Sequence, residues 1–250
     1  MRNIRITLQY KGASFCGWQA QRIKSKGRRP NTLQETIEKA LKKILQEEVS
    51  VVGSGRTDAG VHAEAQVANF RTRSEIPLDK LARALNGVLP ADISVSEVKE
   101  AKSKFHSRFD VRSKVYRYTI LNQPYRSAFF KDTAYFFPHP LDLKRMRKEA
   151  RLLLGRHDFK SFQASDKKDR SSVRRIKKLS IKKEAVLIRI DIEADGFLYN
   201  MVRNIAGTLI EIGRGRFPEG SMKRILRSRD RAQAGPTLPA KGLCLMEVKY

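Results

Sequence analysis

Apolar residues recur along the chain at two periods, and the period changes in a regular order. Alternation at every second position predicts a strand over residues 2–9. Spacings of three and four residues then predict a helix that runs to about residue 46. Asn31 or Thr32 followed by Glu35 has the pattern of an N-terminal capping box, so we expect the helix to begin there.

Three more strands and one more helix complete the first part of the chain. Apolar runs predict strands over residues 49–52, 64–70 and 93–98. Pro77 opens a helix between the last two of these strands, and we expect Asn86-Gly87 to end it. The resulting order, β-α-β-β-α-β, is the ferredoxin-like pattern.

The second part of the chain repeats this order of elements without repeating the sequence. Strands are predicted over residues 111–121, 176–181, 185–192 and 243–248. Helices are predicted over residues 141–154 and 198–212, with a short extra helix over residues 222–227. We therefore predict an α+β fold with two ferredoxin-like halves, residues 1–104 and 105–250, and a basic cleft between them.

The excess of basic residues narrows the function. The chain has 52 Lys and Arg against 26 Asp and Glu, a formal net charge of +26. Such an excess repels itself in a compact protein, so a polyanionic partner is the natural explanation. A membrane surface is the weaker candidate, because the chain has no apolar run of about 18 residues and no evident basic amphipathic helix rich in aromatic residues. We expect a nucleic-acid-binding protein.

The few cysteine and histidine residues restrict the class further. Cys16 and Cys244 lie at opposite ends of the chain and fit reduced thiols better than a disulfide framework. The N-terminus alternates charged and apolar residues and lacks the apolar core of a signal peptide. Four scattered His residues and two lone Cys have no metal-ligand spacing. The sequence therefore predicts a cytoplasmic protein without a metal site.

One glycine-rich stretch carries most of the candidate chemistry. Residues 51–63 read Val-Val-Gly-Ser-Gly-Arg-Thr-Asp-Ala-Gly-Val-His-Ala, so that glycines flank Arg56 and Asp58. Glycine allows positive φ or the close approach of another group. The spacing matches neither the phosphate loop nor the dinucleotide-binding fingerprint. Taken alone, Asp58 has the pattern of an Asx-turn residue or a helix N-cap.

Residues 55–63 closely resemble the active-site motif of the TruA family of tRNA pseudouridine synthases. The resemblance implies that Asp58 is the catalytic carboxylate and that the two halves join in one continuous sheet. The family's reaction breaks the C1′–N1 bond of a uridine and joins C1′ to C5 of the same base, without a cofactor. A single carboxylate that attacks C1′ or takes a sugar proton suffices, unlike the carboxylate pair of an ordinary glycosidase. The order of these steps stays open.

Two further segments extend the resemblance. The segment Met-Val-Arg-Asn contains Arg203, and the family's Arg at this place pairs with the catalytic Asp. On pattern alone, Arg203 is equally well explained as a surface residue with a buried stem. The segment Lys-Val-Tyr-Arg-Tyr contains Tyr116, and the family's first Tyr here contacts the target base. Lys114 replaces the family's Arg and lacks its planar fork, and the alternative for Tyr116 is packing in the core.

Three more residues are predicted to bind substrate. Arg56 contacts the RNA backbone or helps to flip the base, unless it only braces its loop with a salt bridge. Arg108 lies in Phe-His-Ser-Arg-Phe, which is similar to a family segment that borders the same cleft. Leu243 forms a hydrophobic wall of the base pocket by resemblance, and by itself has the pattern of strand core. A Gly-Trp-Gln motif around Trp18 is a further family segment, although a lone Trp also fits the core.

The resemblance covers nearly the whole chain and implies an isomerase that acts on tRNA. Its targets would be uridines 38, 39 and 40 of the anticodon arm, and the enzyme would be a homodimer whose basic surfaces bind tRNA. One alternative is a non-catalytic RNA-binding protein, which the presence of both Asp58 and Arg203 disfavours. The other is a synthase for a different RNA site, which stays open because residues 22–29 and 166–175 are basic, loop-like stretches. The nearest candidate for a second carboxylate, Glu219, follows a proline and fits a turn.

Overall fold

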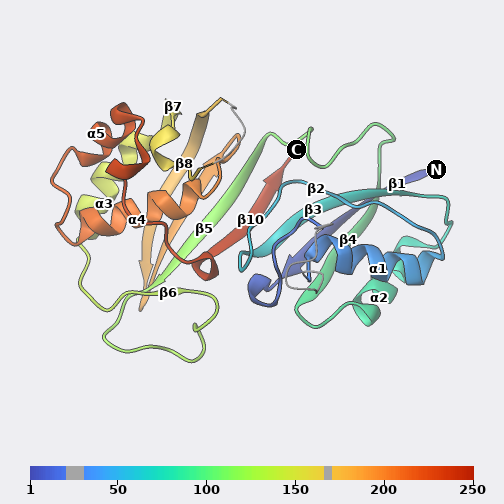
Figure 1. Cartoon of the computed structure of the whole chain (residues 1–250). Helices are drawn as coiled ribbons and strands as arrows, with labels where there is room; N and C mark the ends of the chain where they lie inside the picture. Colours follow the sequence, from blue (N-terminus) through green and yellow to red (C-terminus); the bar gives the residue numbers. More distant parts are fainter. Residues whose placement is uncertain (21–30, 166–170) are drawn as a thin grey trace. The chain divides into compact units, whose positions relative to one another are not determined.

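The chain folds into two compact units in a computed structural model that describes residues 1–20, 31–165 and 171–250 (Figure 1). The first unit comprises Met1–Arg112 and Leu245–Tyr250, and the second comprises Ser113–Cys244. The basic stretch 22–29 and the first part of the stretch 166–175 lie outside the described residues. The division into residues 1–104 and 105–250 stays a prediction.

An antiparallel sheet forms the centre of the first unit. Its strands, in spatial order, are β4 (Ile93–Ala101), β1 (Arg2–Tyr10), β3 (His62–Thr72) and the short β2 (Val52–Gly53). Residues of β1 that point to one face are buried, as the alternation predicted. With the two helices of this unit, the order along the chain is the predicted β-α-β-β-α-β.

The first helix, α1 (Leu33–Leu45), does not begin with the predicted capping box. Thr32 occupies the N-cap position, but its side chain makes no capping hydrogen bond. The first two N–H groups of the helix donate instead to the carbonyl oxygens of Gly17 and Trp18, at 3.1 and 3.0 Å. The predicted N-cap position is therefore confirmed, but not its side-chain hydrogen bond, because a neighbouring segment satisfies the N–H groups that the helix leaves open.

The second helix, α2 (Leu78–Val88), continues past the residues expected to end it. The Asn86 side chain donates to the carbonyl of Val95 at 2.9 Å and accepts from its N–H at 2.7 Å. Asn86 thus fastens the helix to β4 and leaves the helical backbone intact. The predicted stop at Asn86-Gly87 is wrong for this reason.

The second unit is built on a sheet with more strands than the sequence predicted. Its strands, in spatial order, are β5 (Ser113–Leu121), β9 (Leu187–Ala194), β8 (Val173–Glu184) and β7 (Gly155–Asp158), and β6 (Tyr135–Phe136) pairs parallel with β5. The pattern missed β6 and β7 because strands this short show no periodicity. The last strand, β10 (Leu243–Lys249), begins in the second unit and ends in the first.

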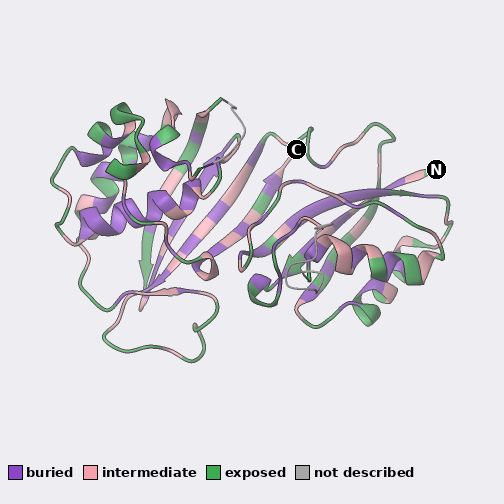
Figure 2. Ribbon diagram, viewed as in Figure 1, coloured by how far each residue is buried: buried purple, intermediate pink, exposed green. Residues whose placement is uncertain are grey.

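Three helices belong to the second unit: α3 (Leu143–Ala150), α4 (Met201–Gly213) and α5 (Ser221–Ser228). Almost every residue of α4 is buried, so this helix lies in the core of its unit (Figure 2). It begins at Met201 and not at residue 198 as predicted, because Asn200 adopts a left-handed φ of 60° that an α-helix does not allow. The expected mixed α+β architecture is confirmed.

Two broad properties follow from the described part of the chain. None of its helices combines the length and the apolar character that a bilayer crossing requires. No cluster of three or more His, Cys, Asp or Glu side chains placed to hold a metal ion occurs among residues 1–20, 31–165 and 171–250.

Candidate active site

The loop that carries Asp58 connects β2 to β3, and a buried glutamine fixes its first half. Gln66 on β3 donates from Nε2 to the carbonyl of Gly55 at 3.0 Å. The Gln66 Oε1 accepts from the Ser54 hydroxyl at 2.6 Å, and the Ser54 N–H donates to the carbonyl of Val67 at 2.7 Å. Ser54 and Gln66 are both fully buried, so the loop leaves the sheet in a defined direction.

A tight turn at Asp58 completes the loop. The Val61 N–H donates to the carbonyl of Asp58 at 3.1 Å, and Gly60 takes a positive φ of 79° within this turn. The hydroxyl groups of Thr57 and Tyr10 are 2.9 Å apart and hydrogen-bonded. Asp58 itself is half-buried.

The Gly-Trp-Gln segment packs directly on the backbone of the Asp58 loop. The backbone N–H of Trp18 donates to the carbonyl of Thr57 at 3.0 Å. A Cβ added to Gly12 would lie 2.0 Å from the Val61 carbonyl oxygen, and one added to Gly17 would lie 2.8 Å from the Thr57 oxygen. Only glycine permits this approach, so these positions serve to hold the loop of Asp58 in place.

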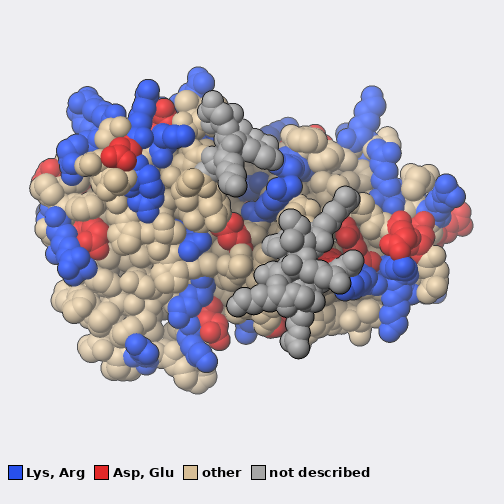
Figure 3. All heavy atoms as spheres, in the orientation of Figure 1, with Lys and Arg blue, Asp and Glu red and all other residues tan. Residues whose placement is uncertain are grey.

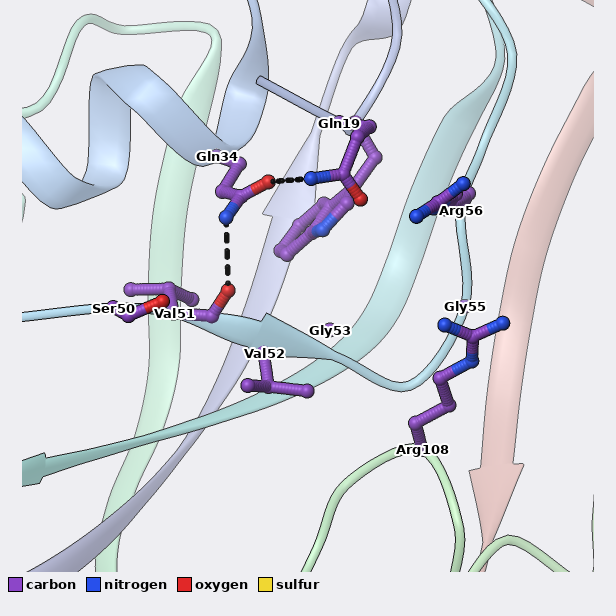
Figure 4. Close-up of a pocket in the computed structure, with 10 residues that line it drawn as sticks. Gln19, Gln34, Ser50, Val51, Val52, Gly53, Gly55, Arg56 and Arg108 are labelled. Atoms are coloured by element: carbon purple, nitrogen blue, oxygen red, sulfur yellow. Dashed lines mark hydrogen bonds between the residues drawn. The ribbon is translucent and has the colours of Figure 1, made fainter. Parts of the chain in front are cut away.

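A cavity of about 150 Å³ opens beside this loop within the first unit (Figure 4). Residues that line it include Trp18, Gln19, Gln34, Val52, Arg56 and Arg108. Figure 4 shows the guanidinium groups of Arg56 and Arg108 on one side of the cavity and the two glutamines on the other. The structure therefore brings together two of the predicted substrate-binding residues, and both side chains are exposed.

Ser107 ties the segment that carries Arg108 to the strand that leads into the Asp58 loop. The Ser107 hydroxyl donates to the carbonyl of Val52 at 2.5 Å, and its N–H donates to Asn69 Oδ1 at 2.9 Å. The hydroxyl of Tyr250 donates to the Ser107 carbonyl at 2.7 Å. Burial raises the pKa of Tyr250, which keeps the phenol neutral and able to donate. The sequence motif indicated Arg108 but not these supports.

Arg203 lies in the first turn of α4, and two hydrogen bonds orient its guanidinium group. Nε donates to the carbonyl of Leu238 at 2.6 Å, and Nη1 donates to Asn200 Oδ1 at 2.7 Å. The left-handed backbone of Asn200 places its side chain at the start of the helix. Arg203 is half-buried. The bonds to Leu238 and Asn200 distinguish it from a freely solvated surface arginine.

Residues 234–242, called the return segment below, contain Leu238 and also reach the face of β5 that carries two tyrosines. The Tyr118 hydroxyl donates to the carbonyl of Pro239 at 2.8 Å, next in sequence to the residue that binds Arg203. A Cβ on Gly242 would lie 2.6 Å from the Tyr118 ring, so the segment passes flat against it. Burial strongly raises the pKa of Tyr118, and the Arg203 charge opposes this in part.

Tyr116 lies two residues before Tyr118 on β5, and Leu243 is the first residue of β10. Tyr116 is 8% exposed and packs edge-on against Phe197, with ring centroids 5.0 Å apart. Leu243 follows Gly242 directly and is 7% exposed. Arg117, between the two tyrosines, points to the opposite face and pairs with Asp191 at 2.7 and 2.9 Å. The alternation predicted for this strand is confirmed.

A partly buried polar cluster that the sequence did not reveal holds the return segment on α4. The Arg231 Nη2 donates to Asn204 Oδ1 at 3.1 Å and to the Thr237 hydroxyl at 3.0 Å. A Cβ on Gly207 would lie 1.9 Å from the Pro236 carbonyl oxygen, so glycine is required there. Desolvation lowers the pKa of Arg231.

Comparison with known proteins places the chain in a family. The sequence model described as tRNA pseudouridine synthase matches residues 6–110 and 150–250. The tRNA pseudouridine synthase A of Caldicellulosiruptor bescii is 44% identical over the full length of both chains. The proteins of the same name from Caldicellulosiruptor saccharolyticus and Thermoanaerobacter sp. are 46% and 43% identical, also over both full lengths. The chain therefore belongs to the tRNA pseudouridine synthases, isomerases that convert uridine to pseudouridine in tRNA.

Proposed function

We propose that this enzyme isomerises uridines 38, 39 and 40 of the tRNA anticodon stem-loop, with Asp58 as the catalytic carboxylate acting on a base flipped out of the RNA. The observation that carries the proposal is the construction of the Asp58 loop. Glycines at 12 and 17 and the buried Gln66 hold its backbone, while Asp58 remains half-buried. A loop held this rigidly presents one carboxylate in a defined place, which catalysis by positioning requires.

The other predicted residues take complementary roles in this proposal. The Arg203 guanidinium pairs with the Asp58 carboxylate and keeps it ionised, since burial alone would favour the protonated acid. Tyr116 offers an aromatic ring for the flipped uracil to stack on, and Leu243 forms an apolar wall of the pocket. The carboxylate attacks C1′ or removes a sugar proton as the C1′–N1 bond breaks. C5 of the detached uracil then bonds C1′, which releases the carboxylate from C1′ or returns the proton to the sugar. C5 finally loses its proton to solvent, and N1 gains one.

The charge of the protein supports an RNA substrate bound through its phosphates. Lys and Arg dominate the charged surface on the face shown in Figure 3. Along β8, the exposed residues Arg175, Lys177, Lys178, Lys182 and Lys183 form a basic strand surface. Phosphate contacts give affinity without reading sequence, which suits an enzyme that accepts several neighbouring uridines. Binding should accordingly weaken steeply with salt.

Tritium release from tRNA labelled at uracil C5 tests the catalytic proposal. Asp58→Ala and Asp58→Asn should abolish release, whereas Asp79→Asn, which removes an exposed carboxylate on α2, should leave it unchanged. The assay contains EDTA and no added cofactor. Release by either Asp58 variant near the wild-type rate would refute the proposed mechanism.

A double-mutant cycle tests the pairing of Asp58 with Arg203. The readout is the free energy of unfolding, because the Asp58→Asn variant has no activity left to lose. Arg203→Gln should destabilise the wild type but destabilise the Asp58→Asn background much less, since the partner charge is already gone there. Additive losses would contradict the pairing.

Substrates with a single uridine test the target positions. Transcripts that carry uridine at only one of positions 38, 39 and 40 should each be modified, and a transcript without any of them should not. Modification elsewhere in the tRNA would move the assignment to another site.

We also propose that the enzyme acts in the cytoplasm as a homodimer. Sedimentation equilibrium at micromolar concentration should give twice the chain mass of 28.6 kDa. A single species at the mass of one chain would refute the dimer without touching the chemistry.

A further inference from the structure

We propose that the cavity beside the Asp58 loop is a subsite for one phosphodiester group of the RNA, held jointly by Arg56 and Arg108. The inference rests on the proposed function, because it assumes that RNA approaches Asp58. The group bound is a phosphodiester, the cavity receives it, and hydrogen bonds to the neighbouring backbone hold the two arginines in place.

The cavity is lined by positive charge. Its lining residues include two arginines and no Asp or Glu. Within the described part of the chain, neither the Arg56 nor the Arg108 guanidinium makes an ion pair or a side-chain hydrogen bond. Two like charges at one small cavity repel each other, and a bound anion removes this repulsion.

Hydrogen bonds fix the backbone next to both arginines. The neighbours of Arg56 are held by the Gln66–Gly55 bond at 3.0 Å and the Trp18–Thr57 bond at 3.0 Å. Arg108 follows Ser107, whose three hydrogen bonds tie it to buried parts of the same unit. Ordering these segments before RNA arrives removes part of the entropy loss on binding.

The opposite wall of the cavity offers little to a neutral base. The Gln34 side chain accepts from Gln19 Nε2 at 2.7 Å and donates to the Val51 carbonyl at 3.2 Å, as the dashed lines in Figure 4 show. Gln34 also donates to Glu38 at 2.9 Å, so its amide is fully engaged. The charged donors that the lining offers to a ligand are the two guanidinium groups, which match the geometry of a phosphate.

The position of the guanidinium groups favours one phosphate over two. Arg108 extends from its segment toward Gly55, and Arg56 lies on the other side of Gly55 (Figure 4). The cavity of about 150 Å³ is smaller than the pockets of about 300–1,000 Å³ that hold drug-sized ligands. A single tetrahedral group with several acceptor oxygens fits such a place.

The salt dependence of RNA binding distinguishes one shared phosphate from two separate ones. The variants are Arg56→Gln, Arg108→Gln and the double variant, and the RNA is an anticodon stem-loop. All carry Asp58→Asn, so that binding is measured without turnover. Each single variant should bind about tenfold more weakly or worse, because a charge-assisted hydrogen bond is lost. For the double variant, the plot of the logarithm of the association constant against the logarithm of the salt concentration should become less steep, its negative slope decreasing in magnitude by about one.

A matched control removes one charge from the same segment outside the cavity. Lys104 is exposed and does not line the cavity, so Lys104→Gln should change affinity much less than Arg108→Gln. If the magnitude of the slope decreased by about two in the double variant, the two arginines would bind separate phosphates and the proposal of one shared phosphate would be refuted. An unchanged slope, or equal effects of Lys104→Gln and Arg108→Gln, would overturn the subsite itself.

Neutralising the RNA one phosphate at a time locates the contact. With a methylphosphonate at the correct position, Arg56→Gln and Arg108→Gln should both lose their effect on affinity. Retention of the full effect at every position would overturn the proposal. Loss at different positions for the two arginines would exclude a common phosphate. Since the readout is binding, a failure of Asp58 catalysis in the tritium assay leaves these results interpretable.

Discussion

The Asp58 loop and the Arg203 turn show two different ways of holding a functional side chain. In the first unit, the backbone of the Asp58 loop is fixed by close approach of Gly12 and Gly17 and by the buried Gln66. In the second unit, the guanidinium group of Arg203 is itself fixed, by hydrogen bonds to Leu238 and Asn200. One region fixes the chain and the other fixes the side-chain tip.

This difference follows from the length of the side chains. Aspartate has few rotatable bonds, so a fixed backbone almost suffices to place its carboxylate. Arginine has a long flexible stem, and a fixed Cα would leave its tip spread over many rotamers unless bonds at the tip select one. Substitutions should therefore harm the first region through the backbone and the second region through the bonds to the guanidinium group.

The largest effect is expected at the tip of Arg203. Arg203→Lys keeps the charge but loses the fork that bonds Leu238 and Asn200, and should lower kcat/KM about tenfold to hundredfold. Steady-state kinetics on tRNA gives the readout. The control is Arg117→Lys, whose partly exposed pair with Asp191 faces the other side of β5 and should affect stability slightly and activity not at all. Equal loss of activity in both variants would show that the fork of Arg203 has no special part.

The glycines that permit close backbone contact should come next. Gly12→Ala and Gly207→Ala each place a methyl group about 2 Å from a carbonyl oxygen and should lower the free energy of unfolding by about 1–3 kcal/mol. Urea unfolding measures this. Gly87→Ala is the control, because no atom lies within 4 Å of its added Cβ and the residue is inside α2. That variant should be about 0.5–1 kcal/mol more stable than the wild type.

A smaller effect is expected from the two buried phenols, one in each unit. Burial raises the pKa of both Tyr118 and Tyr250 above the value near 10 of an unfolded chain. Their contribution to stability is therefore complete below about pH 10 and is lost as the pH rises above it. Tyr118→Phe and Tyr250→Phe should each remove about 1 kcal/mol at neutral pH and flatten the alkaline fall. An unchanged slope between pH 9 and 11 in both variants would contradict this.

The smallest effect is expected at Glu219. This carboxylate is exposed in a turn, as predicted from the proline before it. It pairs with Lys148 on α3. Glu219→Gln should leave tritium release and unfolding unchanged within error, because exposed ion pairs contribute little. A marked loss of activity would mean that a second carboxylate takes part, and the mechanism with one carboxylate would have to be abandoned.

The order of strands and helices was predictable because burial leaves a periodic trace in the sequence. The first β-α-β-β-α-β pattern is present in the described residues, and the second part of the chain keeps its predicted elements with β6 and β7 added. The tyrosines of β5 share a face as expected. The candidate site residues came from local sequence motifs, and the structure gives their burial and hydrogen-bond partners. Strands of two to four residues such as β6 and β7 left no such trace and were missed.

By itself, the sequence determined the fold class, the charge of +26 and the glycine-rich loop around Asp58. Only the tertiary structure decided that Gly17 and Trp18 cap α1, that Leu238 and Asn200 orient Arg203, and that Arg56 and Arg108 line one cavity. The physical reason is that periodicity and turn composition report on each residue's own backbone and burial. Contacts between distant segments depend on how the elements pack, and no local pattern records them.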